Sequence, residues 1–524
     1  MVILGIGGVL RSASAALLIN GEIVAAIEEA KLSRSHRAGD LPSASIAACL
    51  TLGNISGEQV DFVAITRPLA SGGSKLHLQL RAQFPNSRIV VVEHHAAHAA
   101  AAYFASPFEE ARILTLDRSG DFRCGARWNA AGNHMAVEQE MYLPDSLGDI
   151  YGRVTELLGF HQGADEHKVQ WLSASGDDTY TDFFLEMLLP GQGNGVRVNR
   201  TWLSSDRLSR GGFSQEFFQR AGLREDEPIS PKVQASLASG LQRAVEKVVL
   251  QLAGEGGNLC FGGGLAFNAF LVAALERSGL FSGVFVQPNA GNAGNALGAL
   301  YYAWNVVMKQ TSRPSIGNFC LGPGYGPEDI KQVLENCKLR FRYLLTTDEL
   351  IDTAVAELND QKIVAWMHGR MEFGPRALGN RSILASPLDP YSTENLNAFI
   401  KHREPFRKFA ASVPEELASE YFDVGPNARF LATVGKVRPA WKERFQGALL
   451  GEAWIRVHTV RREDNPLYWQ LLHASGKKTG LPALFNTSFN LFSDPLVCTP
   501  RDAVRSFYSS GIDSMFVGNF LLKK

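Results

Sequence analysis

Residues 2–27 read VILGIGGVLRSASAALLINGEIVAAI, a short apolar strand followed by a glycine-rich turn and a hairpin. The hairpin is indicated by Asn20-Gly21, a dipeptide that favours a tight two-residue turn and has apolar residues on both sides. Residues 112–138 repeat this order, because an apolar strand there leads into a polar segment and then into a second hairpin. The two copies predict a duplicated α/β fold.

A duplicated strand, polar loop and hairpin is typical of the actin-like, ribonuclease H-type ATPase architecture. Its two loops face each other across a cleft and can hold the phosphates of a nucleotide. Residues 259–261 form a further predicted strand, which the glycine run 262–264 connects to a predicted helix at 268–276. Glycines that open a helix suit a phosphate contact. The alternative is an ordinary α/β domain whose glycines serve only strand-to-helix packing.

Length and composition describe an ordinary globular chain with more than one domain. The chain has 524 residues, of which 45% are apolar and 20% are charged, and a prior of roughly 150 residues per domain gives two to four domains. Turn-forming residues break the apolar pattern between about 306 and 325, before predicted helices at 327–336 and 347–359. We therefore predict an actin-like domain over residues 1–312 and a smaller α/β domain over residues 318–524.

Charge and cysteine content exclude several classes of protein. The 52 basic and 53 acidic residues leave no overall field that would favour nucleic acid or an anionic membrane. The six cysteines are scattered without a CxxC pair, which favours a reducing cytoplasm over a disulfide framework. No apolar run approaches the ~20 residues of a transmembrane helix. We expect a cytoplasmic protein with no nucleic-acid or membrane partner.

An arginine-rich loop is predicted in the second domain. A predicted strand at 363–367 leads directly into residues 369–387, GRMEFGPRALGNRSILASP. The glycines and prolines let the backbone approach a ligand, and Arg376 and Arg381 offer permanently charged planar groups that match phosphate oxygens. A turn with surface salt bridges is the plainer interpretation. The polar motif KHR that begins at Lys401, and the later FNTSFN segment, favour the phosphate site.

Two histidines in the first domain have the spacing of metal ligands. His94 and His98 lie in an alanine-rich segment that favours a helix, after a predicted strand at 89–92. One helical turn apart, two imidazoles can bind one divalent metal, and Asp117 at the end of the neighbouring strand is a candidate third ligand. The alternative is a pair of buried histidines bonded to backbone carbonyls. The adjacent strand-end aspartate favours the metal.

Two further segments carry polar groups suited to a ligand. Lys168 ends the run Asp-Glu-His-Lys at 165–168 and is positioned to reach an anionic substrate; a solvated charge cluster would have the same composition. Residues 289–295, NAGNAGN, can present backbone N–H groups and amide oxygens to a ligand. An ordinary loop is the alternative for this second segment.

Several long motifs, in one order along essentially the whole chain, resemble the O-carbamoyltransferases of the NodU/CmcH type. They are SAALLINGEIVAAIEE, EHHAAHAAAAYFAS, LTLDRSGD, DEHKVQWLSASGD, GGGLAFN, GNAGNALGAL, GRMEFGPRALGNRSILASP, IKHREPFRKFAASV and LPALFNTSFN. The resemblance implies a threonylcarbamoyl-transferase-like N-terminal domain and a YrdC-like C-terminal domain. It also implies the reaction that each domain carries out.

In the C-terminal domain, the resemblance implies that carbamoyl phosphate and ATP give carbamoyl adenylate and pyrophosphate. Four cationic residues would neutralise the phosphates, and two polar residues would hydrogen-bond the carbamoyl group or the nucleotide. The six residues that match the family's motifs are Lys401, Arg403, Arg376, Arg456, Ser488 and Asn490.

In the N-terminal domain, the resemblance implies transfer of the carbamoyl group to a hydroxyl of a small-molecule acceptor. His94, His98 and Asp117 would hold a divalent metal, expected to be Fe²⁺. The residues implied in nucleotide and ligand binding are Gly263, Gly264, Asn268, Lys168 and Asn292. Ser12 and Asn292 stand where the family usually has aspartates, so we hypothesise that adenylation is retained and that the acceptor pocket has diverged.

Other functions remain open from the sequence. An actin-like kinase or ATPase would form ADP, but it leaves the C-terminal motifs unexplained. A non-catalytic nucleotide-binding scaffold is motivated by the altered positions Ser12 and Asn292, and a tRNA-modifying role lacks a basic balance to support it. The acceptor is not identified, whether an antibiotic sugar, nucleoside, polyketide or oligosaccharide. A homodimer is the one protein partner considered.

Overall fold

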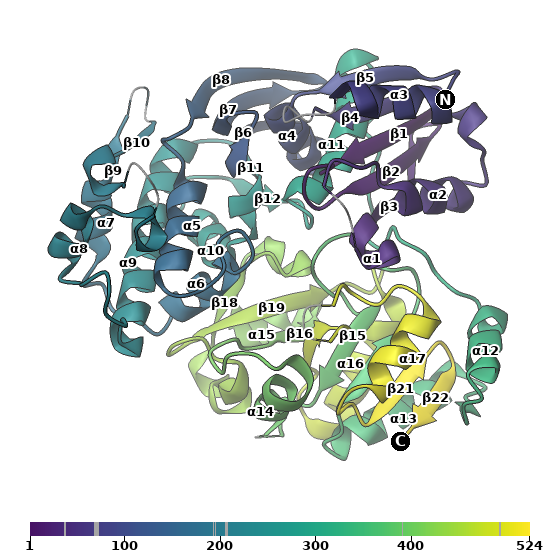
Figure 1. Cartoon of the computed structure of the whole chain (residues 1–524). Coiled ribbons are helices and arrows are strands. Elements are labelled where there is room, and N and C mark those ends of the chain that lie inside the picture. The colour runs from purple at the N-terminus through teal and green to yellow at the C-terminus, as the bar shows by residue number, and fades with distance from the viewer. Residues whose placement is uncertain are drawn as a thin grey trace.

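The protein is described by a computed structural model over residues 1–35, 38–67, 73–191, 193, 195–204, 208–389, 391–491 and 494–524. Three large sheets and one two-stranded sheet form within these residues, with the first two large sheets side by side and the third below them in Figure 1. Within the described residues, no helix combines the length and the apolar character needed to cross a bilayer.

The first two sheets have the same topology. Each consists of three antiparallel strands in sequence, followed by two strands that add parallel to the first one. The strand order of the first sheet is β3 (Glu22–Glu28), β2 (Ser14–Ile19), β1 (Val2–Gly7), β4 (Phe62–Thr66) and β5 (Arg88–Val92). The strand order of the second sheet is β8 (His134–Tyr142), β7 (Arg123–Ala131), β6 (Glu110–Gly120), β11 (Asn258–Gly262) and β12 (Gly283–Val286). The predicted duplication is confirmed.

Two buried helices, α4 (His94–Phe104) and α11 (Asn295–Tyr301), pack against each other and link the two sheets (Figure 1). Alanines fill most of α4 and leave room for the close approach of α11. The remaining elements of this half are α1 (Glu29–Ser33), α2 (Ser43–Leu52), α3 (Gly73–Gln83), α5 (Leu147–Leu157), α6 (Glu166–Ser173), α7 (Thr181–Met187), α8 (Gln215–Ala221), α9 (Pro231–Ala253), α10 (Ala269–Arg277) and the hairpin β9 (Leu188–Pro190) and β10 (Val196–Val198).

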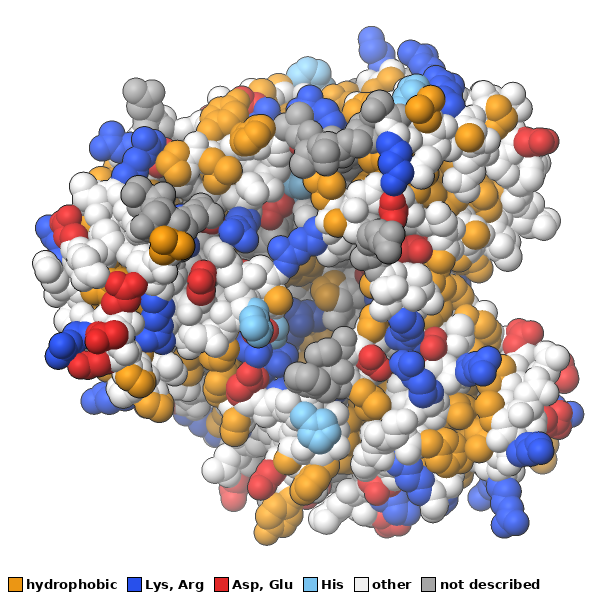
Figure 2. Space-filling view, in the orientation of Figure 1, with side chains coloured by type: hydrophobic (Ala, Val, Ile, Leu, Met, Phe, Trp, Pro, Cys, Tyr) orange, Lys and Arg blue, Asp and Glu red, His pale blue; other side chains and the backbone are white. Residues whose placement is uncertain are grey.

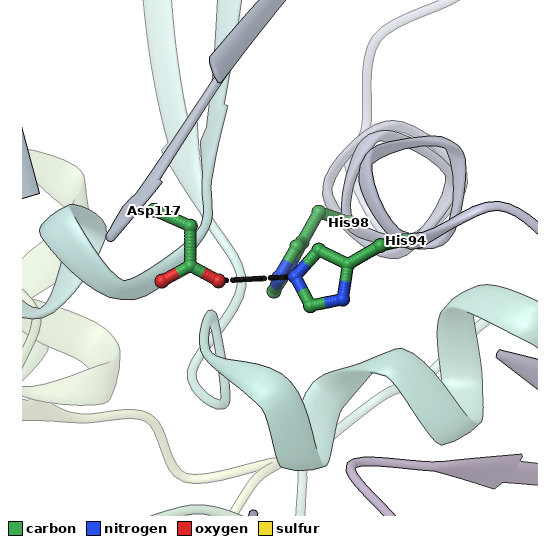
Figure 3. A group of neighbouring side chains, drawn as sticks. All are labelled: His94, His98 and Asp117. Carbon is green, nitrogen blue, oxygen red and sulfur yellow. Dashed lines mark hydrogen bonds and ion pairs between the residues drawn. The ribbon is translucent and has the colours of Figure 1, made fainter. Parts of the chain in front are cut away.

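The polar segment after the second copy's first strand differs from the expectation. It was predicted as a loop from Asp117 to Asp121, but β6 continues through it to Gly120. The pairing of β6 with β7 is irregular between Leu116 and Gly120. This irregularity turns the Asp117 side chain towards α4, where the predicted histidines lie (Figure 3).

The third sheet has ten strands, and helices cover both of its faces. In order they are β13 (Arg342–Tyr343), β22 (Phe520–Lys523), β21 (Ser514–Val517), β14 (Val364–Met367), β15 (Arg381–Ala385), β20 (Leu484–Ser488), β16 (Ala410–Pro414), β19 (Trp454–Val460), β18 (Val434–Val437) and β17 (Phe422–Asp423). The helices are α12 (Pro327–Asn336), α13 (Thr347–Asn359), α14 (Ser392–Asn395), α15 (Ala418–Tyr421), α16 (Pro466–Thr479) and α17 (Pro500–Tyr508). The predicted bounds of α12 and α13 are confirmed.

Strand β14, in the centre of this sheet, has apolar residues at every position because both of its faces are covered. Val364 and Trp366 pack into one core with α13 and α16, while Ala365 and Met367 pack into a second core on the other face. Alternate side chains of a strand point to opposite faces, so a strand covered on both sides needs apolar residues at every position. The arginine-rich loop follows β14 directly and therefore starts from a rigid support.

Buried ionic contacts join the third sheet to the first half. Lys31 Nζ lies 2.9 Å from Glu28 Oε2 and donates to the backbone carbonyls of Glu372 and Gly374 at 2.8 and 2.7 Å. Glu28 Oε1 in turn accepts from the Gly374 N–H at 2.7 Å. These contacts fix the arginine-rich loop against β3 and α1. The exact domain limits, 1–312 and 318–524, stay a prediction.

Candidate active site

A cavity of about 560 Å³ lies between the two halves of the chain. Figure 2 shows a hollow between the upper and lower parts, with Lys, Arg and His side chains at its rim. From the first half it is lined by residues that include Asp117, Gly264, Asn268 and Asn292, and from the second by residues that include Arg376, Arg403, Arg456 and Ser488. Eight residues predicted from the sequence are thus brought to one cavity.

The wall formed by the second half is strongly cationic. It carries Arg376, Arg403, Arg407 and Arg456, together with Lys408. Burial, and then the neighbouring guanidinium of Arg407, lower the pKa of Arg376 to about 10 and that of Arg403 to about 9. Burial, followed by the charges of Arg376 and Arg403, also lowers the pKa of Arg456 well below its usual value. Crowded cations of this kind indicate a site that an anionic ligand completes.

Arg376 is better placed for a ligand than Arg403 and Arg456. None of the described residues forms a hydrogen bond or ion pair with its guanidinium. Arg403 is held by Asn397 Oδ1 at 2.7 Å, and Arg456 donates to the Leu431 carbonyl at 2.6 Å. The free fork of Arg376 is therefore available to two oxygens of a phosphate.

The arginine-rich loop wraps around one buried carboxylate. Glu372 is fully buried, and its Oε1 accepts from the backbone N–H groups of Leu378, Asn380 and Arg381 at 2.8, 2.9 and 3.0 Å. Arg381, expected to face a phosphate, is instead fully buried and donates to the carbonyls of residues that include His368 at 2.8 Å. Arg381 therefore shapes the loop, and Arg376 is the residue that the loop presents.

Lys401 and Asn490 also lie elsewhere than expected. Lys401 is buried, and its ammonium donates to the carbonyls of Ser488 and Asn490 at 2.6 and 2.9 Å and to Asn490 Oδ1 at 2.8 Å. Because these three acceptors occupy all three of its N–H bonds, Lys401 fixes the end of β20. Asn490 is tied up in the same cluster, while Ser488 lines the cavity.

Asn486 contributes a lone acceptor to the cationic wall. Its Nδ2 donates to the Ala377 carbonyl at 3.1 Å and to Ser412 Oγ at 3.2 Å. Since a carbonyl can only accept, these bonds fix the orientation of the amide. Asn486 lines the cavity, and its buried Oδ1 has no hydrogen-bond partner among the described residues. It can therefore accept from an N–H of a ligand.

The wall formed by the first half contains the predicted metal group. Figure 3 shows the Asp117 carboxylate pointing at the His94 and His98 rings on α4. Asp117 Oδ2 lies 3.0 Å from His94 Nε2 and 3.4 Å from His98 Nε2, and the two nitrogens are 3.1 Å apart. One donor atom from each of the three residues lies within 4.8 Å of the others. The spacing fits one shared cation.

The three side chains of this group shift one another's pKa values. Burial raises the pKa of Asp117, but hydrogen bonds from His94 and His98 outweigh it and hold that pKa well below its usual range. Burial lowers the pKa of His98. Burial also acts to lower the pKa of His94, but the hydrogen bond with Asp117, followed by the charge of Asp117, outweighs it and raises that pKa. Asn292 lines the same cavity, and its buried Oδ1, which has no partner among the described residues, offers a further oxygen ligand.

The neighbouring histidine shows what a purely structural histidine looks like in this helix. His95 Nδ1 lies 2.9 Å from Thr115 Oγ1, and its Nε2 lies 3.1 Å from the Arg123 carbonyl. Burial, followed by the charges of His94 and His98, lowers its pKa to about 3. His95 therefore matches the alternative of a buried, carbonyl-bonded histidine, and His94 and His98 do not.

Of the residues predicted to bind a nucleotide, Gly263 and Gly264 lie beside Asp117, and Asn268 lines the cavity. A Cβ at Gly264 would lie 2.9 Å from Asp117 Oδ1, and at Gly263, where φ is +89°, it would lie 2.2 Å from the Leu116 carbonyl oxygen. These glycines allow the turn to pass beside Asp117. Asn268 lines the cavity and bonds Gln242 Oε1 at 2.7 Å.

Lys168 is engaged in ion pairs at the boundary between the halves. Its Nζ lies 3.2 Å from Asp165 Oδ2 and 2.8 Å from Glu404 Oε1. These ion pairs link α6 to the loop that carries Arg403 and Arg407, and the contact of Lys168 with an anionic substrate stays a prediction. The neighbouring His167 lines the cavity instead.

Sequence reasoning missed part of the cavity wall. Arg407 and Lys408 follow Arg403 in the quoted segment IKHREPFRKFAASV, so charge density was the available signal. The sequence around His167 and Asn486 carries no such signal, because what matters is one nitrogen and one oxygen that have no partner among the described residues, and only the fold shows this. The other missed charged residues of the wall are Arg11, Arg118 and Glu166.

Two family models match the chain on either side of this cavity. The model described as the carbamoyltransferase N-terminus matches residues 73–301, and that of the carbamoyltransferase C-terminus matches residues 355–524. An uncharacterized protein of Synechocystis sp. is 31% identical over 100% of this chain and 96% of its own length. The chain belongs to the carbamoyltransferase family. The predicted resemblance is confirmed, and this carbamoyltransferase requires a carbamoyl donor and an acceptor.

Other relatives and structures extend the comparison. Nodulation protein NolNO of Sinorhizobium fredii is 32% identical to this carbamoyltransferase, over 98% of the chain and 78% of the relative. Among solved structures, component A of (R)-2-hydroxyglutaryl-CoA dehydratase from Acidaminococcus fermentans is 15% identical, covers 58% of this chain and 97% of its own, and has a TM-score of 0.36. That structural likeness is too low to assign a function.

Proposed function

We propose that this carbamoyltransferase uses ATP and carbamoyl phosphate to make carbamoyl adenylate, and then transfers the carbamoyl group to a hydroxyl of a small-molecule acceptor. The observation that supports this proposal is the single cavity between a cationic wall and a wall with a metal-type group. Phosphate chemistry needs concentrated positive charge, and acyl transfer needs a polarised carbonyl. Both requirements are met by residues of one chamber.

The first step uses the cationic wall. One carbamoyl phosphate, one ATP and one water give carbamoyl adenylate, pyrophosphate and phosphate, because the carbamoyl oxygen must lose its own phosphate before it can bond to the α-phosphorus. Arg376, Arg403 and Arg456 neutralise the phosphates of both substrates. Asn486 Oδ1 accepts from the carbamoyl amino group. The YrdC-like signature residues Lys401 and Asn490 act by fixing β20.

The second step uses the opposite wall. The acceptor oxygen bonds to the carbamoyl carbon, and the bond between that carbon and the AMP oxygen breaks. His94, His98, Asp117 and Asn292 would hold a divalent metal, for which Fe²⁺ is the expectation from the family resemblance. When bound, such a cation supplies Lewis-acid polarisation of a carbonyl oxygen. The adenylate stays within the cavity, which limits its loss to water.

Phosphorus NMR of the reaction products tests this function. The protein with carbamoyl phosphate and ATP is expected to form pyrophosphate and AMP, since the α-phosphorus is the site of attack. Formation of ADP without pyrophosphate would favour the kinase alternative and overturn the proposal. Mass spectrometry with a panel of hydroxylated metabolites then identifies the acceptor through the mass of an added carbamoyl group.

The role of Asn486 gives a separate prediction. Phosphonoacetamide and acetonylphosphonate are stable analogues of carbamoyl phosphate that differ only by an amino group against a methyl group. Asn486→Ala is expected to weaken phosphonoacetamide binding about tenfold, the ~1.4 kcal/mol of one hydrogen bond, and to leave acetonylphosphonate binding unchanged. Calorimetry measures both. The matched control is Asn519→Ala, because the Asn519 amide bonds the Leu344 carbonyl away from the cavity.

A further inference from the structure

His167 presents a free nitrogen lone pair to the cavity. It lies in the first turn of α6, and its Nδ1 is 3.1 Å from the Ala164 carbonyl oxygen. A carbonyl oxygen can only accept, so Nδ1 carries the proton and Nε2 is the basic nitrogen. His167 lines the cavity, and its buried Nε2 has no hydrogen-bond partner among the described residues. The ring is thus held in the tautomer of a proton acceptor.

The charges around His167 keep that nitrogen unprotonated. Burial, followed by the positive charges of Arg407 and Arg376, lowers the pKa of His167 to about 4, and Asp165 opposes the shift only in part. The imidazole is therefore neutral at pH 7. A bound phosphate ligand would offset the two arginine charges and make Nε2 a stronger base while the substrates are present.

Two carboxylates of the same wall already have partners, Asp117 at both oxygens and Glu166 at one of them. The Asp117 carboxylate faces His94 and His98, and its Oδ1 accepts from the Arg118 N–H at 2.8 Å. Glu166 Oε1 accepts from the Gly163 N–H. Acyl transfer to a hydroxyl needs a group that removes the hydroxyl proton as the new bond forms. His167 differs from both carboxylates because it offers a buried nitrogen lone pair that no described residue occupies.

We propose that His167 is the general base of the transfer step, an inference that rests on the proposed function. His167 Nε2 takes the proton of the acceptor hydroxyl, and the acceptor oxygen bonds to the carbamoyl carbon of carbamoyl adenylate. The bond from that carbon to the phosphate oxygen breaks, and AMP leaves with its electron pair. The products are the O-carbamoyl acceptor and AMP, and the histidine then releases its proton to solvent.

Two nucleophiles of different strength test this role. Glycerol and water are weak oxygen nucleophiles that need a base, whereas hydroxylamine attacks activated acyl groups without one and gives hydroxyurea. In His167→Gln, formation of carbamoyl glycerol is expected to fall about 10²-fold or more. When glycerol is left out and water is the nucleophile, formation of AMP is expected to fall to the same extent. Pyrophosphate release in the first turnover and hydroxyurea formation are expected to stay within about threefold of wild type.

The controls separate the possible failures. His161→Gln replaces an exposed histidine of the same segment and is expected to match wild type in every assay. Unchanged carbamoyl glycerol and AMP formation in His167→Gln would overturn the inference, as would an equal loss of hydroxyurea, which indicates a structural role. If the wild-type protein itself releases no pyrophosphate, the proposed function fails and the inference fails with it.

Discussion

Replacing Arg376 by alanine is expected to reduce pyrophosphate release from carbamoyl phosphate and ATP by about 100-fold or more. Arg376 lines the cavity, and its guanidinium has no partner among the described residues. A charge-assisted hydrogen bond contributes about 1.5–3 kcal/mol, and tenfold in rate corresponds to about 1.4 kcal/mol. Losing a two-pronged contact with a phosphate is therefore expected to lower the rate of pyrophosphate release by more than two orders of magnitude. A coupled pyrophosphate assay measures it.

The comparison for Arg376 is a surface arginine that makes an ordinary ion pair. Arg505 lies 3.1 Å from Asp494 on the exposed side of α17, so Arg505→Ala is expected to retain wild-type pyrophosphate release. Arg376→Lys keeps the charge but loses the planar fork, and partial activity is expected. Normal pyrophosphate release by Arg376→Ala would show that the phosphates bind elsewhere.

Replacing His98 by alanine is expected to abolish carbamoyl transfer while pyrophosphate release continues in the first turnover. His98 is buried, and its Nε2 lies 3.1 Å from His94 Nε2 and 3.4 Å from Asp117 Oδ2. Removing one of three clustered donors is expected to lower metal content to a small fraction of wild type. Elemental analysis of the purified protein measures the metal, and mass spectrometry measures the carbamoylated product.

The control for His98 is a histidine outside the metal-type group. His134 is exposed at the start of β8, so His134→Ala is expected to keep both the metal and the transfer activity. Elemental analysis also tests the expected identity of the ion, because the wild-type protein should contain iron. Retention of the wild-type metal content by His98→Ala would contradict the assigned ligands.

Local patterns in the sequence predicted most of the fold. The hairpin signal at Asn20-Gly21 and its echo in residues 112–138 led to the duplicated sheets, because hairpin turns depend on a few adjacent residues. The helices predicted at 327–336 and 347–359, after the turn-forming residues, have the predicted ends in α12 and α13. The His94 and His98 spacing was readable for the same reason, since one helical turn fixes it.

The parts of the site that were not predicted depend on contacts between distant residues. Lys401 and Arg381 match phosphate-binding chemistry by residue type, yet backbone carbonyls occupy their donors in the fold. Conversely, Asn486 and His167 have no distinctive chemistry in the sequence, but each lines the cavity with one buried atom that none of the described residues pairs with. A sequence shows which donors exist, but not which of them the protein itself uses.

The two walls of one cavity are proposed to perform successive steps, so the two steps should be separable. The most direct measurement is the amount of pyrophosphate and of carbamoylated acceptor formed in parallel by wild-type protein and by His98→Ala. We predict near-equal amounts for the wild type, and a first-turnover yield of pyrophosphate with no carbamoylated acceptor for His98→Ala. Loss of pyrophosphate and carbamoylated product to the same extent in His98→Ala would contradict the division of the reaction between the two walls.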